Sequence, residues 1–257
     1  MLPPAVADRL ARAICASAGG YLRNPVRQDG RTCTVCTTPV DGFRRCYNCN
    51  EHLRSGAELA DATAFLTYAI AGRQSGYVMR HYKADKPVEE HVGVVTVLLL
   101  LALAKHASCP ASLLGAPVTH WATVPSLPAR PVEHPLRRLV RGVMAQAAPQ
   151  LGEIAMAAAS SVRDARALDP GHFTVPEGIP RNSHVLLIDD TWTKGGHAQS
   201  AASALRGAGA KTVSVMVVAR WINEDFRDNG RFLREIASED YDPAICPWTG
   251  GNCPRPN

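Results

Sequence analysis

The sequence lacks any apolar run long enough to cross a membrane. Its longest run, residues 92–104, is interrupted by a glycine and a threonine and falls short of the roughly 20 apolar residues that a spanning helix needs. The N-terminus carries Asp8 and Arg9 where a secretory signal would be continuously apolar. We find no internal repeat and no helix-turn-helix segment. These absences predict a cytoplasmic protein without a membrane partner, give no support to a ligand-sensing regulator, and make residues 92–104 a buried helix.

The composition is that of a folded globular protein, but it does not indicate a particular class of ligand. Hydrophobic residues make up 46% and charged residues 20% of the 257 residues, which is typical of globular proteins with a sizeable core. The formal net charge of +5 suits an anionic small substrate as well as it suits nucleic acid.

The cysteines fall into a pattern typical of metal binding. Cys33 with Cys36, and Cys46 with Cys49, form two CxxC pairs separated by nine residues. Two such turns provide four thiolates, which is how structural Zn²⁺ is held in a closed tetrahedral site. A redox CxxC and unrelated free thiols are the alternatives. Four other cysteines stand apart: Cys15 and Cys109 are expected to be buried as small hydrophobic residues, whereas Cys246 and Cys253 could bridge, bind metal with other residues, or stay free.

The chain divides into three segments by composition. Residues 1–55 hold the paired cysteines and predict a small zinc-ribbon-like segment. Residues 56–230 predict the main α/β domain, with a helical part over 56–110, because Ala60, Ala64, Phe65 and Tyr68 recur at helical spacing. The tail, 231–257, is polar and then rich in proline and glycine, and its fold is not predicted.

From residue 118 onward, strands and helices alternate. Buried strands are predicted at 118–124, 184–189 and 212–219, and helices at 134–148 and 198–206. A strand, a crossover helix and a further strand in this order predict a parallel sheet flanked by helices.

The most informative run is VLLIDDTWTKGGHAQS, which begins at Val185. An apolar strand ends in Asp189 and Asp190, and a turn with Gly195 and Gly196 leads into a helix. Ligands of parallel sheets bind beyond the carboxyl ends of the strands. We expect the two glycines to let the backbone approach an anion, which the N–H groups of the turn and helix start would bind. The carboxylates would face hydroxyls or a cation instead. A plain turn is the alternative interpretation.

This run resembles the phosphoribosyl-diphosphate signature of type I phosphoribosyltransferases. The resemblance implies that Asp189 and Asp190 hold the ribose hydroxyls at the catalytic centre. It also implies that the loop over 191–197 binds the 5′-phosphate through Thr191, Thr193, Lys194, Gly195, Gly196 and His197. Lys194 and His197 stand where the family usually has threonines.

The cysteine pairs ahead of this run make the chain similar to one family in particular, the ComF-type, competence-associated phosphoribosyltransferase-like proteins. Tyr82-Lys83 and Val124-Pro125-Ser126 resemble two further elements of that family, whose Arg-Gly-Phe-Asn-like element is not recognisable here. The implied fold is a type I phosphoribosyltransferase-like parallel sheet flanked by helices, with a small N-terminal zinc-ribbon segment.

The resemblance also implies a reaction, a glycosyl transfer from phosphoribosyl diphosphate, with Mg²⁺, to a small nitrogenous acceptor that the sequence does not identify. Further candidates for binding the leaving diphosphate are Lys83, Arg130 and Arg163. The alternative is a DNA-uptake accessory protein that binds nucleic acid on the same fold, because arginines and aromatic residues intermingle around the paired cysteines. The oligomeric state is not predicted.

Overall fold

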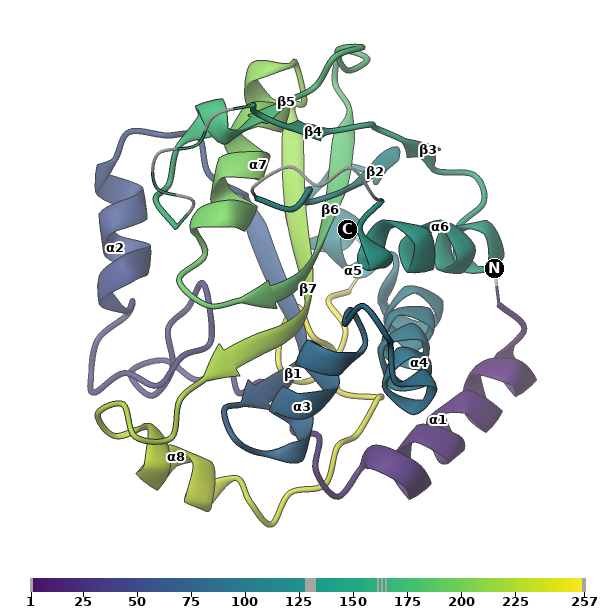
Figure 1. The fold of residues 1–257 in the computed structure, drawn as a ribbon, viewed down its shortest axis with the longest axis vertical. Coiled ribbons are helices and arrows are strands. Elements are labelled where there is room, and N and C mark those ends of the chain that lie inside the picture. Colours follow the sequence, from purple (N-terminus) through teal and green to yellow (C-terminus); the bar gives the residue numbers. More distant parts are fainter. Residues whose placement is uncertain (1, 128–132, 161, 163, 165, 256–257) are drawn as a thin grey trace.

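The protein is built around one parallel β-sheet (Figure 1). A computed structural model describes residues 2–127, 133–160, 162, 164 and 166–255. The five strands lie in the order β1-β7-β6-β2-β3, and every pairing is parallel. Their bounds are β1 Ala62–Ile70, β2 His120–Thr123, β3 Gly152–Glu153, β6 His184–Trp192 and β7 Thr212–Ile222. The predicted α/β class with a parallel sheet is confirmed.

Both faces of the sheet are buried, which explains why its strands read as continuous apolar runs. On β6, Leu186 and Ile188 belong to one hydrophobic core, whereas Val185 and Leu187 belong to the other. This alternation follows from the two-residue period of a strand, which points successive side chains to opposite faces.

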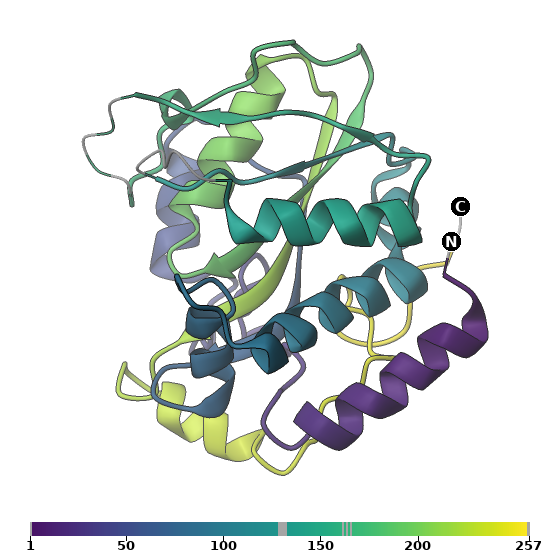
Figure 2. The ribbon, with the colours of Figure 1, turned by 45° about the vertical axis from the view of Figure 1, so that its right-hand side comes forward.

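Different elements cover the two faces (Figures 1 and 2). One core is closed by helices α1, α4 and α6, with residues of α3 and α5. The other is closed by α7 and by the paired-cysteine segment. The helices are α1 Pro4–Ala18, α2 Tyr47–Arg54, α3 Gln74–His81, α4 Glu89–His106, α5 Cys109–Leu114, α6 Pro135–Ala147, α7 Gly196–Gly207 and α8 Asn229–Glu235. The expected buried helix around residues 92–104 is therefore α4.

Short elements complete the chain. Strands β4 (Ala157–Ala158) and β5 (Phe173–Thr174) pair antiparallel beside the 3-10 helix η1 (Pro170–His172). Helix α8 packs against Tyr68 and Ile222 in a third small core. None of the helices in the described ranges is long and apolar enough to span a membrane.

The helical face predicted for residues 60–68 is wrong, because Ala62–Ile70 forms strand β1. The interior residues of this strand are buried on both of its sides. A strand covered on both faces loses the alternation that identifies a strand, so apolar residues at three- and four-residue spacing match a helix by accident. Helix α1, which we grouped with the cysteine segment, packs against α4 in the core of the α/β body.

Candidate functional site

The candidate site lies where β6 passes into α7. Strand β6 continues to Trp192, three residues beyond its predicted end, and α7 begins at Gly196. Only residues 193–195 therefore form the connecting bend. Gly195 occupies the N-cap of α7 with a φ of 90°, a left-handed conformation that glycine adopts without steric cost.

Packing within the protein requires glycine at both of these positions. A Cβ at Gly195 would lie 2.2 Å from the Trp192 ring. A Cβ at Gly196 would lie 2.4 Å from the carbonyl oxygen of Arg166. The structure therefore gives both glycines a packing reason, and the expected approach of a phosphate to their backbone stays a prediction. Trp192 is 1% exposed and packs edge-on to Phe65, so it supports the bend from beneath.

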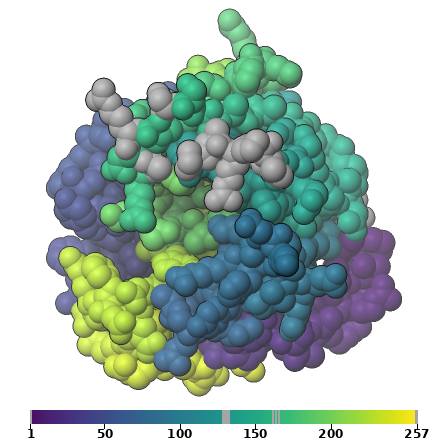
Figure 3. All heavy atoms as spheres, viewed as in Figure 1, coloured from purple at the N-terminus to yellow at the C-terminus, as the bar shows by residue number. Residues whose placement is uncertain are grey.

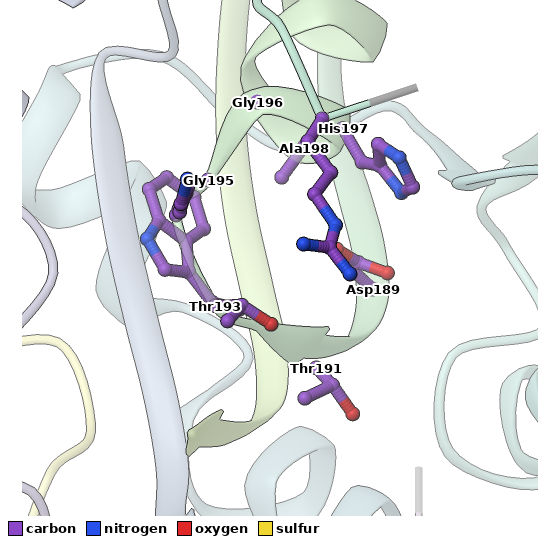
Figure 4. A pocket seen from close by; sticks show the side chains of 10 residues that line it. Asp189, Thr191, Thr193, Gly195, Gly196, His197 and Ala198 are labelled. Carbon is purple, nitrogen blue, oxygen red and sulfur yellow. The ribbon is translucent and has the colours of Figure 1, made fainter. Parts of the chain in front are cut away.

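A pocket of about 240 Å³ opens at this bend (Figure 4). In Figure 3, green atoms of this part of the chain are visible at the surface beside the blue atoms around α3. The pocket is lined by one acid, two cations and the residues of the bend, namely Arg166, Asp189, Thr191, Trp192, Thr193, Lys194, Gly195, Gly196, His197 and Ala198. Every residue that we assigned to the 5′-phosphate loop is among them.

The bend presents backbone donors to this pocket. Within the described part of the chain, the N–H groups of Thr193, Lys194, Gly195 and Gly196 donate to no other backbone or side-chain group. Consecutive N–H groups at the start of a helix bind anions through direct hydrogen bonds and the helix dipole. The exposed Arg166 and Lys194 add positive charge at the rim. The pocket can therefore bind an anion such as a phosphate group.

A buried arginine fixes the shape of the bend. Arg220 is 6% exposed near the end of β7, and its Nη1 donates to the carbonyl oxygens of Trp192 (2.8 Å) and Thr193 (2.9 Å). Because these carbonyls are held on the side of Arg220, the guanidinium contributes to the orientation of the peptides that follow. We did not predict Arg220. Its signal is a charged side chain that directly follows the apolar run MVVA.

Asp189 is the acid that reaches the pocket. It is 8% exposed, and its Oδ1 accepts a hydrogen bond from the backbone N–H of Asp190 at 2.8 Å. Burial, reinforced by the neighbouring Asp190 carboxylate, raises the pKa of Asp189 to about 8. Burial of this carboxyl group therefore favours its protonated form.

Asp190 points to a different set of partners. Its Oδ2 accepts hydrogen bonds from the Tyr82 hydroxyl (2.7 Å) and the Lys83 ammonium (2.6 Å). His134 Nε2 lies 3.9 Å from the same oxygen. Burial alone would raise the pKa of Asp190, but Lys83 and Tyr82 lower it below its usual value. Asp190 does not line the pocket. The structure thus places the predicted Lys83 beside a predicted acid and separates the roles of the two acids.

The remaining predicted residues differ in orientation (Figure 4). Thr193 and His197 border the same space as Asp189, whereas the hydroxyl of Thr191 points away from the glycines. Thr191 Oγ1 is buried without a hydrogen-bond partner among the described residues. Thr191 also still belongs to β6. The donors of the bend therefore begin at Thr193.

Two predicted candidates, Arg130 and Arg163, lie outside the described residues. Arg166 was not predicted, although it lines the pocket from the segment before η1. Its backbone N–H donates to Asp164 Oδ1 at 2.9 Å, which shapes the turn that carries it. No residue pattern distinguishes Arg166 from the other arginine in the run VRDARA, because only the fold brings it to Gly196.

The four paired cysteines meet in space as predicted. The sulfur atoms of Cys33, Cys36, Cys46 and Cys49 all lie within 4.8 Å of one another. The Sγ atoms of Cys36 and Cys46 are 3.6 Å apart, close to the edge of about 3.8 Å that a tetrahedron with metal–sulfur distances of ~2.3 Å would have. The arrangement fits one structural metal ion with no open position. His52, the neighbouring histidine, is not part of the group.

Hydrogen bonds tie the cysteine segment to the sheet that carries the pocket. The Tyr68 hydroxyl, on β1, donates to the Thr37 carbonyl at 2.8 Å and accepts from the Val26 N–H at 3.1 Å. Cys33, Cys36 and Cys49 share a hydrophobic core with Trp192. The cysteine cluster therefore supports the face of the sheet on which the bend rests.

Comparison with known proteins adds no relative to this description. The chain matches no family model, and it matches no curated protein sequence.

Proposed function

We propose that this protein is a phosphoribosyltransferase of the ComF-like type, which binds phosphoribosyl diphosphate and transfers its phosphoribosyl group to a nitrogen acceptor. The observation that carries the proposal is the β6–α7 bend. Its N–H groups from Thr193 to Gly196 lack protein partners in the described ranges, and they adjoin the pocket that Asp189 also lines. Backbone N–H donors for an anion and a carboxylate in the same pocket match a sugar phosphate, which carries negative charge at one end and hydroxyl groups at the other.

In this proposal the 5′-phosphate binds at the start of α7. The backbone donors of residues 193–196 bind its oxygens, while Lys194 and Arg166, both at the pocket, compensate its charge. Asp189 accepts hydrogen bonds from ribose hydroxyls. In the transfer itself, the bond from the anomeric carbon to the diphosphate oxygen breaks, and a bond from that carbon to the acceptor nitrogen forms. The nitrogen then loses a proton to solvent or a base.

Asp190 acts in the proposal as a positioning residue. Its ion pair with Lys83 and its hydrogen bond from Tyr82 hold the end of α3 against the end of β6. Lys83, whose side chain is 33% exposed, remains close enough to solvent to contribute positive charge toward a leaving diphosphate. This arrangement gives Lys83 one fixed carboxylate partner rather than the free surface position of an ordinary lysine.

Mg²⁺, which the family resemblance implies, fits this site only in part. The ion binds mainly through phosphate oxygens and few protein carboxylates, and Asp189 is the carboxylate that lines the described pocket. Bound Mg²⁺ would supply charge neutralisation for the diphosphate. A cation beside Asp189 would also favour the ionised carboxylate, against the burial that raises its pKa.

We assign Zn²⁺ to the four-cysteine cluster. Four thiolates in a closed tetrahedral arrangement favour this ion and leave no position for substrate. Its role in the proposal is structural, because Cys33, Cys36 and Cys49 pack in the same core as Trp192.

Turnover of phosphoribosyl diphosphate tests the proposal. The purified protein with Mg²⁺ would be mixed with a panel of nucleobases and amines, and ³¹P spectra would follow diphosphate release. We expect release that depends on one class of acceptor and is lost in Asp189→Ala. Arg231→Gln is the matched control, because Arg231 is exposed on α8 and does not line the pocket. No acceptor-dependent release with any compound, together with no binding of the substrate, would refute the proposal.

A second function, nucleic-acid binding, is favoured by one observation. Phe43 and Tyr47 in the cysteine segment are each 69% exposed, and the exposed Arg44 and half-exposed Arg45 lie between them in the chain. Exposed aromatic rings beside arginines can stack bases and contact phosphates. Binding of single-stranded DNA should then weaken steeply with salt and in Arg44→Glu/Arg45→Glu, but not in Arg231→Glu. Negligible affinity at physiological salt would exclude this function.

A further inference from the structure

The structure gathers a second group of metal-binding side chains, far from the first in sequence. His106 ends α4, Cys109 begins α5, and Cys246 and Cys253 come from the C-terminal tail. One ligand atom from each of these four residues lies within 4.8 Å of the others. Residues more than 130 positions apart in the chain thus meet at one point.

The spacing of these atoms matches a tetrahedral site. The Sγ atoms of Cys109 and Cys246 are 3.7 Å apart, and His106 Nδ1 lies 3.2 Å from Cys253 Sγ. Tetrahedral zinc with Zn–S of ~2.3 Å and Zn–N of ~2.0 Å would give edges of about 3.8 Å between sulfurs and about 3.5 Å between sulfur and nitrogen. The sulfur spacing is close to the 3.6 Å found between Cys36 and Cys46 in the first cluster.

His106 is oriented as a metal ligand. Its Nδ1 faces Cys253, while its Nε2 lies 3.2 Å from the carbonyl oxygen of Pro243. With the proton on Nε2, the imidazole donates to that carbonyl, which leaves the Nδ1 lone pair directed at the cluster. Histidine ligands in metal sites usually donate their other ring N–H in this way, and the bond fixes both tautomer and ring orientation.

The tail loop has the same backbone turn as the first cysteine loop. In the first cluster the N–H of Thr37 donates to the Cys33 carbonyl at 2.9 Å, and Thr37 has a left-handed φ of 56°. In the tail the N–H of Gly250 donates to the Cys246 carbonyl at 2.8 Å, and Gly250 has a left-handed φ of 77°. Each turn begins at a buried cysteine of a cluster. This likeness is independent of the distances between ligands.

We propose that His106, Cys109, Cys246 and Cys253 bind a second structural zinc ion through three thiolates and one imidazole. Soft thiolates with an imidazole favour Zn²⁺ among divalent ions, and four protein ligands leave no position for a substrate. Three of the ligands are buried, and only Cys253 is exposed, so the ion would enter from the side of the chain end.

The second zinc anchors the C-terminal tail. Beyond α8 the described tail contains no helix or strand, so regular backbone pairing does not hold it. It instead runs beside the N-terminal part of the chain, where the Tyr241 N–H donates to the Gly19 carbonyl and Asp242 exchanges two hydrogen bonds with Asn24. A metal linking Cys246 and Cys253 to the α4–α5 junction closes this long loop, and binding to the folded chain adds to its stability.

Metal stoichiometry tests the proposal. Elemental analysis of the full chain, purified with reductant and without chelator, should give two zinc ions per chain. Cys253→Ser should reduce this to one, and because Cys253 is exposed the fold should tolerate the change. Cys33→Ser should also leave one, and the double variant should retain none. Contrary to the expected burial, Cys15 is exposed, and it lies outside both clusters. Cys15→Ser is therefore the matched control and should keep two zinc ions.

A second readout locates the ion. In the Cys33→Ser background, which keeps only the proposed site, chelator should speed hydrogen exchange over residues 241–255, and the added Cys253→Ser change should remove that response. One zinc in the wild type that is lost entirely in Cys33→Ser would overturn the proposal. So would two ions retained in Cys253→Ser and His106→Ala, or a Cys109–Cys246 disulfide in protein taken directly from a reducing extract.

Discussion

The Lys83 ammonium lies 2.6 Å from Asp190 Oδ2, and this ion pair joins the end of α3 to the end of β6. The adjacent acid, Asp189, faces the other way and lines the pocket. Neighbouring residues of a strand point to opposite sides, so one acid of the pair borders the pocket and the other pairs with protein side chains. This division decides what each substitution should do.

Replacing Lys83 alone should destabilise the fold more than replacing both Lys83 and Asp190. Lys83→Met leaves the Asp190 carboxylate buried with the Tyr82 hydroxyl as its short-range donor, which we expect to destabilise the fold by about 1–3 kcal/mol. Fully buried pairs cost more, but Lys83 keeps 33% of its side chain exposed. Denaturant unfolding of Lys83→Met, Asp190→Asn and the double variant would measure the coupling. If the stability losses of the two single variants add up to the loss in the double variant, the predicted coupling is contradicted.

The same pair should shape acid stability. Lys83 lowers the pKa of Asp190 below its unfolded value of 3.8. The ion pair therefore stabilises the protein above that pH and loses its contribution as the pH falls below it. The destabilisation caused by Lys83→Met should accordingly shrink below pH 3.8, measured as the difference in unfolding free energy from wild type. A difference that stays constant down to the lowest pH at which the protein folds would contradict this.

Asp189 should make the folding stability depend on pH in the opposite direction. Its pKa rises from 3.8 in the unfolded chain to about 8 in the folded protein, so the folded state binds the extra proton between these values. Stability should then fall as the pH rises through this window, by at most ~1.4 kcal/mol per pH unit. Asp189→Asn should flatten the slope between pH 5 and 8 and stabilise the protein at pH 8. Asp29→Asn, at an exposed position, should leave the slope unchanged.

Much of this arrangement could be predicted from the sequence, because it depends on local order along the chain. The strand before Asp189, the glycines after Thr193 and the cysteine pairs are contiguous motifs, and their backbone consequences follow directly. Arg166 and Arg220 could not be predicted, since each reaches the bend only through tertiary packing. The packing role of Gly196 could not be predicted for the same reason, because the carbonyl oxygen of Arg166 approaches it from another segment.

The wrong prediction of a helix where the structure has β1 has a related cause. A strand buried on both faces has no polar side to mark its period, so Ala64, Phe65 and Tyr68 matched a helix. For the second cysteine–histidine cluster, the sequence left metal binding by Cys246 and Cys253 open and did not indicate their partners, because Cys109 and Cys246 lie 137 positions apart. Spacing rules find metal sites only where the ligands lie close in sequence.

Arg220 should control the shape of the bend. Arg220→Met removes the donor to the Trp192 and Thr193 carbonyls, which should cost about 1–3 kcal/mol for unpaired polar groups near the core. It should also weaken phosphate binding without touching the ligand, by about ten-fold. Arg231→Met, at an exposed site, is the control. Thermal unfolding and phosphate titration would be compared, and a variant with wild-type values in both would show that Arg220 does not organise the bend.

Metal removal should loosen one face of the sheet first. Chelation, or Cys33→Ser, should raise hydrogen exchange over residues 33–54 before it affects the interior of β6. This segment has little regular structure apart from α2, so its order depends on the metal. Its hydrogen bond to Tyr68 joins it to β1 at the edge of the sheet. Cys15→Ser should behave as wild type. Uniform exchange across the chain after chelation would indicate that the cluster supports the whole fold rather than this segment.

The central claim, that the β6–α7 bend binds the phosphate of phosphoribosyl diphosphate, is tested most directly by calorimetric titration with Mg²⁺ present. Wild type should bind, and Arg166→Gln and Lys194→Gln, each removing one exposed cation from the pocket, should each lose about ten- to a hundred-fold in affinity, equivalent to ~1.5–3 kcal/mol. Gly195→Ala, strained by the φ of 90° and by the Trp192 ring, should lose more, whereas Arg231→Gln should bind as wild type does. No binding by the wild type, or equal affinities in all of these proteins, would mean that the bend only connects a strand to a helix.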